Sequence, residues 1–150
     1  MREIKFRAKT CNGEWVDGLL AYKDDKWYIS NKAGMPFAFE VRPETISQYT
    51  GLKDKNGKDI YEGDIVSFQI VSFQLDNDSC PFPNKDTKKR VGKIFFSDYR
   101  ASFAITMGRN GSKSMNNDLY KYVQCGNRVE VIGNKFDNPE LLERGAEWVD

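Results

Sequence analysis

Apolar and polar residues alternate along the first part of the chain, which is the pattern of strands with one buried face. In residues 3–9, three apolar residues alternate with four charged ones: Ile4, Phe6 and Ala8 against Glu3, Lys5, Arg7 and Lys9. A period of two predicts a half-buried strand. The next strand is predicted at residues 14–22, where Gly18 indicates a bulge. Shorter strands follow at residues 27–29, 37–41 and 45–49.

The second half of the chain carries a longer strand pattern at residues 65–75, the run IVSFQIVSFQL. Its alternation is imperfect, so we expect either a bulge or partial burial of both faces. A hairpin is predicted from residues 91–96 and 101–106, followed by a helical or extended piece at 119–124 and a strand at 128–132. Asn138 and Pro139 indicate the start of a short helix at residues 139–144.

Two polar segments, residues 76–90 and 107–118, show no period and are predicted to be mobile loops. The chain contains no internal repeat and no heptad pattern. Many short strands separated by turns rich in Gly, Asn, Asp and Pro indicate a mainly β sandwich or small barrel.

The amino-acid composition excludes several kinds of catalytic and metal-binding site. The 150 residues include no histidine, which excludes Ser-His and Cys-His nucleophiles and histidine metal sites. Cys11, Cys80 and Cys125 are widely spaced and form no CxxC pair, so neither a disulfide framework nor a structural zinc site is predicted. We therefore expect no cofactor and no metal, and we expect that the protein is not an enzyme.

Charge and hydropathy bear on the compartment and on the partner. The chain has 23 basic and 22 acidic residues, a net charge of +1 and a mean hydropathy of -0.66. No stretch approaches the roughly 18 apolar residues of a membrane helix, and no apolar region follows the basic start. We expect a soluble cytoplasmic protein without a membrane partner, and the near-zero net charge argues against a polycation that coats nucleic acid.

Residues 50–66, TGLKDKNGKDIYEGDIV, contain three evenly spaced glycines among charges of both signs. A phosphate-binding loop needs a following helix and a Lys-Ser/Thr pair, and this segment has neither. Glycine and asparagine supply the backbone angles that tight turns require. We therefore interpret four residues as structural turn positions: Asn56, Gly57, Gly63 and Asp64.

Three segments together resemble the YopX family of phage and prophage proteins: IKFRA, SQYTGLKDKNGKDIYEGDIV and VEVIGNKFDNPELL. The resemblance implies a mainly β fold with a small SH3-like barrel core, and expression in a bacterial cell. It supplies no catalytic residue. We predict one domain over residues 1–150, with an N-terminal β-meander at 1–44, the barrel core at 45–137, and a short C-terminal helix and tail at 138–150.

Basic residues give the clearest binding hypothesis. Lys5 and Arg7 share one strand face with Lys9, and a second basic run lies in the middle of the chain: Lys88, Lys89, Arg90 and Lys93. Small β-barrels bind single strands through cations and aromatic platforms. One alternative function is therefore sequence-independent nucleic-acid binding. Lysines on an exposed edge strand also serve simply to prevent edge pairing.

Two further alternatives come from the carboxylates. Asp59, Glu62 and Asp64 lie close together in sequence, as in a carboxylate-metal hydrolase. The acidic end of the chain, which includes Leu141, Leu142 and Trp148, either docks on its own domain or meets the basic loop of a second copy in a homo-oligomer. The preferred interpretation is a phage or prophage accessory protein, a non-enzymatic module that binds a host or phage protein or nucleic acid.

Overall fold

The computed structural model describes residues 2–31, 38–69, 89–106, 118–124 and 128–143. Within these ranges the chain forms two antiparallel sheets and a few short helices, which confirms the prediction of a mainly β protein. Two compact units are present, Met1–Gly51 and Leu52–Asp150. Each unit is described by itself below, and the single domain over residues 1–150 stays a prediction.

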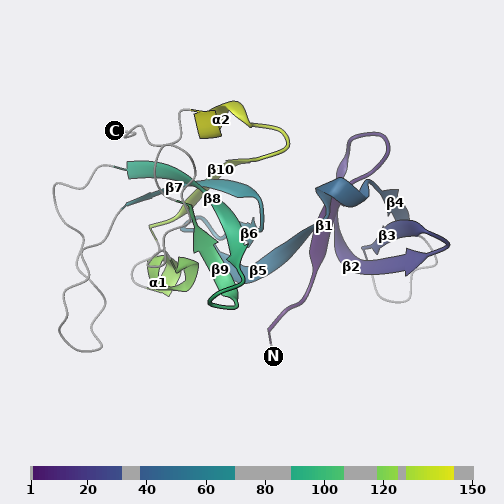
Figure 1. The fold of residues 1–150 in the computed structure, drawn as a ribbon, viewed down its shortest axis with the longest axis horizontal. Helices are drawn as coiled ribbons and strands as arrows, with labels where there is room; N and C mark the ends of the chain where they lie inside the picture. Colours follow the sequence, from purple (N-terminus) through teal and green to yellow (C-terminus); the bar gives the residue numbers. More distant parts are fainter. Residues whose placement is uncertain (1, 32–37, 70–88, 107–117, 125–127, 144–150) are drawn as a thin grey trace. The chain divides into compact units, whose positions relative to one another are not determined.

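The first unit is an antiparallel meander (Figure 1). Its elements are β1 (Phe6–Lys9), β2 (Trp15–Lys23), β3 (Lys26–Ser30), β4 (Phe39–Val41), the 3-10 turn η1 (Pro43–Thr45) and β5 (Ser47–Lys53). The strands lie in the order β4-β3-β2-β1-β5, so the last strand pairs with the first. The strands β1 to β4 are neighbours in chain order, which is the arrangement of a meander.

The sheet of the first unit curls. An isolated bridge joins Thr10, just after β1, to Val41 of β4, and the Arg42 amide donates to the Lys9 carbonyl oxygen at 2.8 Å. The curl encloses a core of Ala8, Ile29 and Val41, which come from the alternate positions that the sequence pattern selected. No closed barrel is detected in the described residues, and most of this curled sheet lies before residues 45–137, where the barrel core was predicted.

Gly18 does not form the predicted bulge. The register of β2 is regular against β1 up to Gly18 and against β3 from Leu19 onward. Gly18 has a φ of 149°, and a Cβ at this position would overlap the Ser30 carbonyl oxygen. Close approach of two backbones, rather than an inserted residue, therefore explains this glycine.

The second unit holds the remaining elements. They are β6 (Asp59–Tyr61), β7 (Asp64–Gln69), β8 (Lys89–Ser97), β9 (Ser102–Ile105), α1 (Leu119–Gln124), β10 (Glu130–Asn134) and α2 (Glu140–Glu143). Four strands form a sheet in the order β10-β7-β8-β9 (Figure 1). The predicted hairpin is confirmed as β8 and β9, although β8 begins at Lys89, inside the segment predicted as a loop.

Both faces of β7 are covered, as its imperfect alternation suggested. All five residues from Asp64 to Phe68 are buried. Val66 and Phe68 face a core with Ile94 and Ile105, while Ile65 points to the opposite side and is also buried. The bulge in this sheet lies elsewhere, between Val131 and Gly133 of β10.

Other predictions need correction or lie outside the described residues. Strand β5 continues through Gly51 to Lys53, beyond residue 49, where the predicted strand ended. Asn138 uses its side-chain oxygen to accept the Asn134 amide at 3.3 Å, just before α2. Residues 70–88, 107–117 and 144–150 hold most of the two predicted loops and the acidic tail, and they are outside the described residues.

None of the helices in the described part of the chain has the length and apolar character needed to cross a membrane.

Candidate functional site

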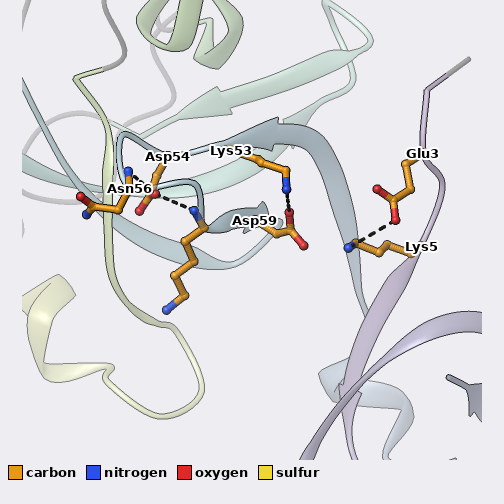
Figure 2. Close-up of polar contacts among 7 residues, drawn as sticks. Glu3, Lys5, Lys53, Asp54, Asn56 and Asp59 are labelled. Atoms are coloured by element: carbon orange, nitrogen blue, oxygen red, sulfur yellow. Dashed lines mark hydrogen bonds and ion pairs between the residues drawn. The ribbon is translucent and has the colours of Figure 1, made fainter.

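The first half of the central charged segment is a hairpin between β5 and β6 (Figure 2). One carboxylate oxygen of Asp54, Oδ1, accepts the amides of Asn56 at 2.8 Å and Lys58 at 2.9 Å. The Gly57 amide donates to the Asp54 carbonyl oxygen at 3.0 Å, and Gly57 has a φ of 81°. Asn56 keeps a negative φ, so the loop is a turn closed by a left-handed glycine rather than a primed two-residue turn.

Asp54 also ties this hairpin to a distant strand. Its second oxygen, Oδ2, accepts the Val131 amide of β10 at 3.0 Å, and Asp54 is only 3% exposed. The Lys55 amide donates to the Val129 carbonyl oxygen at 2.9 Å, and the Lys55 ammonium lies 3.2 Å from Glu130. The hairpin is thus held against β10 by hydrogen bonds on either side of one buried carboxylate.

The second half of the segment is the turn between β6 and β7. Asp64 is fully buried, and its Oδ2 accepts the Tyr61 amide at 2.8 Å. Gly63 has a φ of 87°, donates its amide to Ile94 and accepts the Lys135 amide, both at 2.9 Å. Two of the segments that carry the family resemblance, around residues 54–64 and 129–138, therefore fold onto one another.

These contacts bear on the hydrolase alternative. Asp59 forms an ion pair with Lys53 at 3.5 Å (Figure 2), and Asp64 is hydrogen-bonded within its own turn. Among the described residues, no group of three potential ligands is placed to hold a metal ion. Of the three residues of the hydrolase alternative, Asp59 and Asp64 are thus each engaged with a protein partner.

The basic residues predicted on β8 do not share a face. Arg90 pairs with Phe68 and therefore lies on the core side of the sheet, whereas Lys89 and Lys93 alternate to the other side. Burial raises the pKa of Tyr122 in that core, and the nearby Arg90 guanidinium partly opposes the rise. Lys88 lies outside the described residues. The predicted basic residues of β8 therefore do not form one continuous basic surface, because alternate residues of the strand face opposite sides of the sheet.

The basic residues on β1 form a different kind of surface. The Lys5 ammonium lies 4.8 Å above the Tyr49 ring, and Arg7 and Lys9 lie 4.9 Å and 5.3 Å from the ring of Trp15. Register places these residues on one side of the sheet, because Lys9 pairs with Trp15 and the Tyr49 amide donates to Lys5. Such stacking keeps the positive charge while fixing the side chain.

We call the side of this sheet opposite the Ala8–Ile29–Val41 core the cation–aromatic face. Its members are Lys5, Arg7, Lys9, Lys23, Lys26, Asp17, Glu40, Trp15, Tyr28 and Tyr49. Five cations stand against two carboxylates, and Glu3 beside Lys5 at 3.5 Å (Figure 2) brings the net charge to +2. Lys26 and Glu40 lie 3.8 Å apart.

Lys5 and Arg7, predicted as contact residues, thus belong to the first unit, and Lys89, Arg90 and Lys93 belong to the second. Sequence reasoning missed the position of Trp15 beside Arg7 and Lys9. A signal was available, since residues 11–13 between the two predicted strands form the turn of an antiparallel hairpin that places Lys9 opposite Trp15. It also missed Asp54, whose spacing two residues before Asn56 fits a side-chain-capped turn.

Comparisons with known proteins agree with this architecture. The family model described as YopX protein matches residues 5–143. Protein EF1440 from Enterococcus faecalis, known from a crystal structure, is similar with 23% sequence identity and a TM-score of 0.54. The alignment covers 95% of this chain and 100% of that one, and it supports the fold alone. No curated protein sequence matches the chain.

Proposed function

The chain belongs to the YopX family, and on this premise we propose that it is a phage or prophage accessory protein that acts as a non-enzymatic binding module. Its partner is an acidic macromolecule, either nucleic acid or an acidic host or phage protein. The observation that carries the proposal is the cation–aromatic face of the first unit. Arg7 and Lys9 of β1, and Lys5 just before it, are stacked on aromatic rings of the neighbouring strands.

The chemistry of this face suits recognition of anions. Arg7 and Lys9 keep their charge while Trp15 limits the conformations of their side chains, so less entropy is lost when they meet an anion. Ala8 on the other side of the same strand is fully buried, which fixes the backbone that carries them. A rigid strand presents a binding constellation more accurately than a loop does.

The proposal includes an SH3-like barrel, assigned to the first unit. A five-stranded meander whose last strand follows a 3-10 turn and pairs with the first strand is the arrangement of SH3-like barrels, and β1 to β5 with η1 follow it. The bridge from Thr10 to Val41 supports the same assignment, because it brings the first and fourth strands together.

The experiment is affinity capture from bacterial cells after phage infection or prophage induction, with and without nuclease treatment of the lysate. The bait is the full chain, compared with a variant carrying Lys5→Gln, Arg7→Gln and Lys9→Gln. A matched control carries Lys89→Gln and Lys93→Gln on β8. We expect the control to capture the same partner as the unaltered chain and the β1 variant to lose it. Equal capture by all three baits, or loss only in the control, would contradict the proposal.

A nucleic-acid partner is the more specific form of this function. It is favoured by the aromatic rings that lie among the cations, since an acidic protein surface needs only the charges. The expected affinity falls with added salt, because each phosphate contact releases counterions.

A further inference from the structure

We infer that the cation–aromatic face binds single-stranded nucleic acid, with the backbone following β1 and a base stacking at Trp15. The inference rests on the proposed binding function and names its partner class. It assigns the contact to the first unit alone.

The spacing of the cations fits a polynucleotide backbone. Lys5, Arg7 and Lys9 are alternate residues of one extended strand, so their side chains leave the sheet about 7 Å apart. This is comparable with the separation of successive phosphates in an extended single strand. The three cations therefore form a straight row that three consecutive phosphates can follow.

The rings lie on either side of that row. Trp15 belongs to β2 and Tyr49 to β5, the two strands that flank β1, at opposite ends of the row. Neighbouring strands are about 4.8 Å apart, so each ring lies within reach of a base attached to the nearest phosphate. Tyr49 is 5% exposed, whereas Trp15 is half-buried, so Trp15 is the more accessible of the two rings.

A duplex fits this surface poorly. Reading the major groove of DNA takes a helix or a two-stranded ribbon that protrudes, and β1 is an interior strand with a neighbour on each side. The bases of a duplex are stacked on each other and are not available to Trp15. Stacking on an aromatic ring with cations beside it is the usual means of holding single strands.

The test is fluorescence anisotropy of labelled twelve-nucleotide oligomers, dT12 and U12, with the full chain. A twelve-base-pair duplex and an acidic polyglutamate peptide of similar charge serve as competitors. The variants are Trp15→Leu, the double change Arg7→Gln and Lys9→Gln, and Lys89→Gln as the matched control from β8. Circular dichroism and the fluorescence of Trp27 check that each variant is folded.

We expect single strands to bind at least tenfold more tightly than the duplex. Contact with three phosphates predicts a loss of affinity of about twentyfold between 50 and 200 mM salt, from a slope of roughly −2. Trp15→Leu should weaken binding about 5- to 150-fold, the range of one lost stacking contact. The double change should make the salt dependence shallower, and Lys89→Gln should change affinity by less than about twofold, since it lies outside the row of phosphate contacts.

Two results overturn the inference and leave the proposed function standing: duplex binding as tight as single-strand binding with no effect of Trp15→Leu, or binding of polyglutamate without binding of the oligomers. If neither oligomers nor polyglutamate bind at low salt, the inference and the proposed function both fail. If Trp15→Leu does not fold, the test is the salt dependence of binding by the double variant. An unchanged slope would mean that β1 does not contact the phosphates, and the inference would fail.

Discussion

The central turn segment and the cation–aromatic face both gather charged residues, yet they use them in opposite ways. Around residues 54–64 the buried carboxylates of Asp54 and Asp64 accept backbone amides, and Asp54 does so from three N–H groups. On β1 the cations Arg7 and Lys9 lie over the ring of Trp15. The segment that marks the family most clearly is therefore framework, and the less distinctive strand carries the candidate chemistry.

The comparison predicts its largest effect at Asp54. Asp54→Ala leaves three amide donors without a carboxylate, one of them on β10, and should lower the free energy of unfolding by about 3–5 kcal/mol. Asp59→Asn is the matched control, since its ion pair with Lys53 is partly exposed and should cost less than about 1 kcal/mol. Urea denaturation of both variants makes the measurement. Equal losses of stability in the two variants would contradict the structural role of Asp54. If folded Asp54→Ala failed to bind the oligonucleotides, the central turn segment would also contribute to binding.

The pH dependence of stability tests the burial of Tyr122 in the core of the second unit. The pKa of Tyr122 is raised by burial, so above pH 10 the unfolded chain ionises this phenol while the folded chain keeps its proton. Stability from this group is complete below pH 10 and is lost as pH rises toward the folded-state pKa. Relative to Tyr122→Phe, the free energy of unfolding should fall by up to about 1.4 kcal/mol per pH unit. Denaturation at pH 8, 10 and 11 tests this, and parallel curves for the two proteins would contradict it.

Two strained turn residues allow the stability of each unit to be changed separately. Ala101 in the β8–β9 hairpin has a φ of 51°, and Asp24 in the β2–β3 hairpin has a φ of 52°. Ala101→Gly should stabilise the chain by about 1 kcal/mol, and Asp24→Gly by about half as much, because Asp tolerates this region better. In a Trp148→Phe background, tryptophan fluorescence reports the first unit only. A shift of that signal by Ala101→Gly would show that the two units unfold together.

The smallest expected effect concerns the surface of the hairpin. Lys55→Gln removes the ion pair with Glu130 but keeps the backbone bond from residue 55 to Val129. The pair is partly exposed, so the loss should be about 0.5 kcal/mol or less and should vanish at high salt. Thermal denaturation at low and high ionic strength measures it. A loss above 1 kcal/mol that persists in salt would mean that charge pairing, rather than Asp54, holds the hairpin to β10.

Local pattern was sufficient for much of the fold. The alternation of Phe6 and Ala8 with Lys5 and Arg7 predicted β1 and its buried side, because a strand turns successive residues to opposite faces. The imperfect alternation of β7 likewise predicted a strand covered on both sides. Gly57 and Gly63 have the positive φ that their turns require, whereas Asn56 does not.

What the sequence did not reveal depends on partners far along the chain. Asp54 looked like one charge among several, since its bond to Val131 spans 77 residues and leaves no local pattern. The strand predicted at residues 45–49 extends to Lys53 as β5, and Gly51, with a φ of 86°, lies within it. Arg90 lies on the opposite face of the sheet from Lys89 and Lys93 because of the register between β8 and β7. A run of basic residues in the sequence does not reveal this register.

The long reach of Asp54 also sets an order of events during synthesis. At 5–20 residues per second, Val131 follows Asp54 out of the ribosome after roughly 4–15 seconds. In that interval the hairpin has only its local bonds to Asn56 and Lys58, while all five strands and the core of the first unit have already been made. The nascent chain should therefore form its candidate binding face before the hairpin at Asp54 is hydrogen-bonded to β10. The two regions then become native at different times.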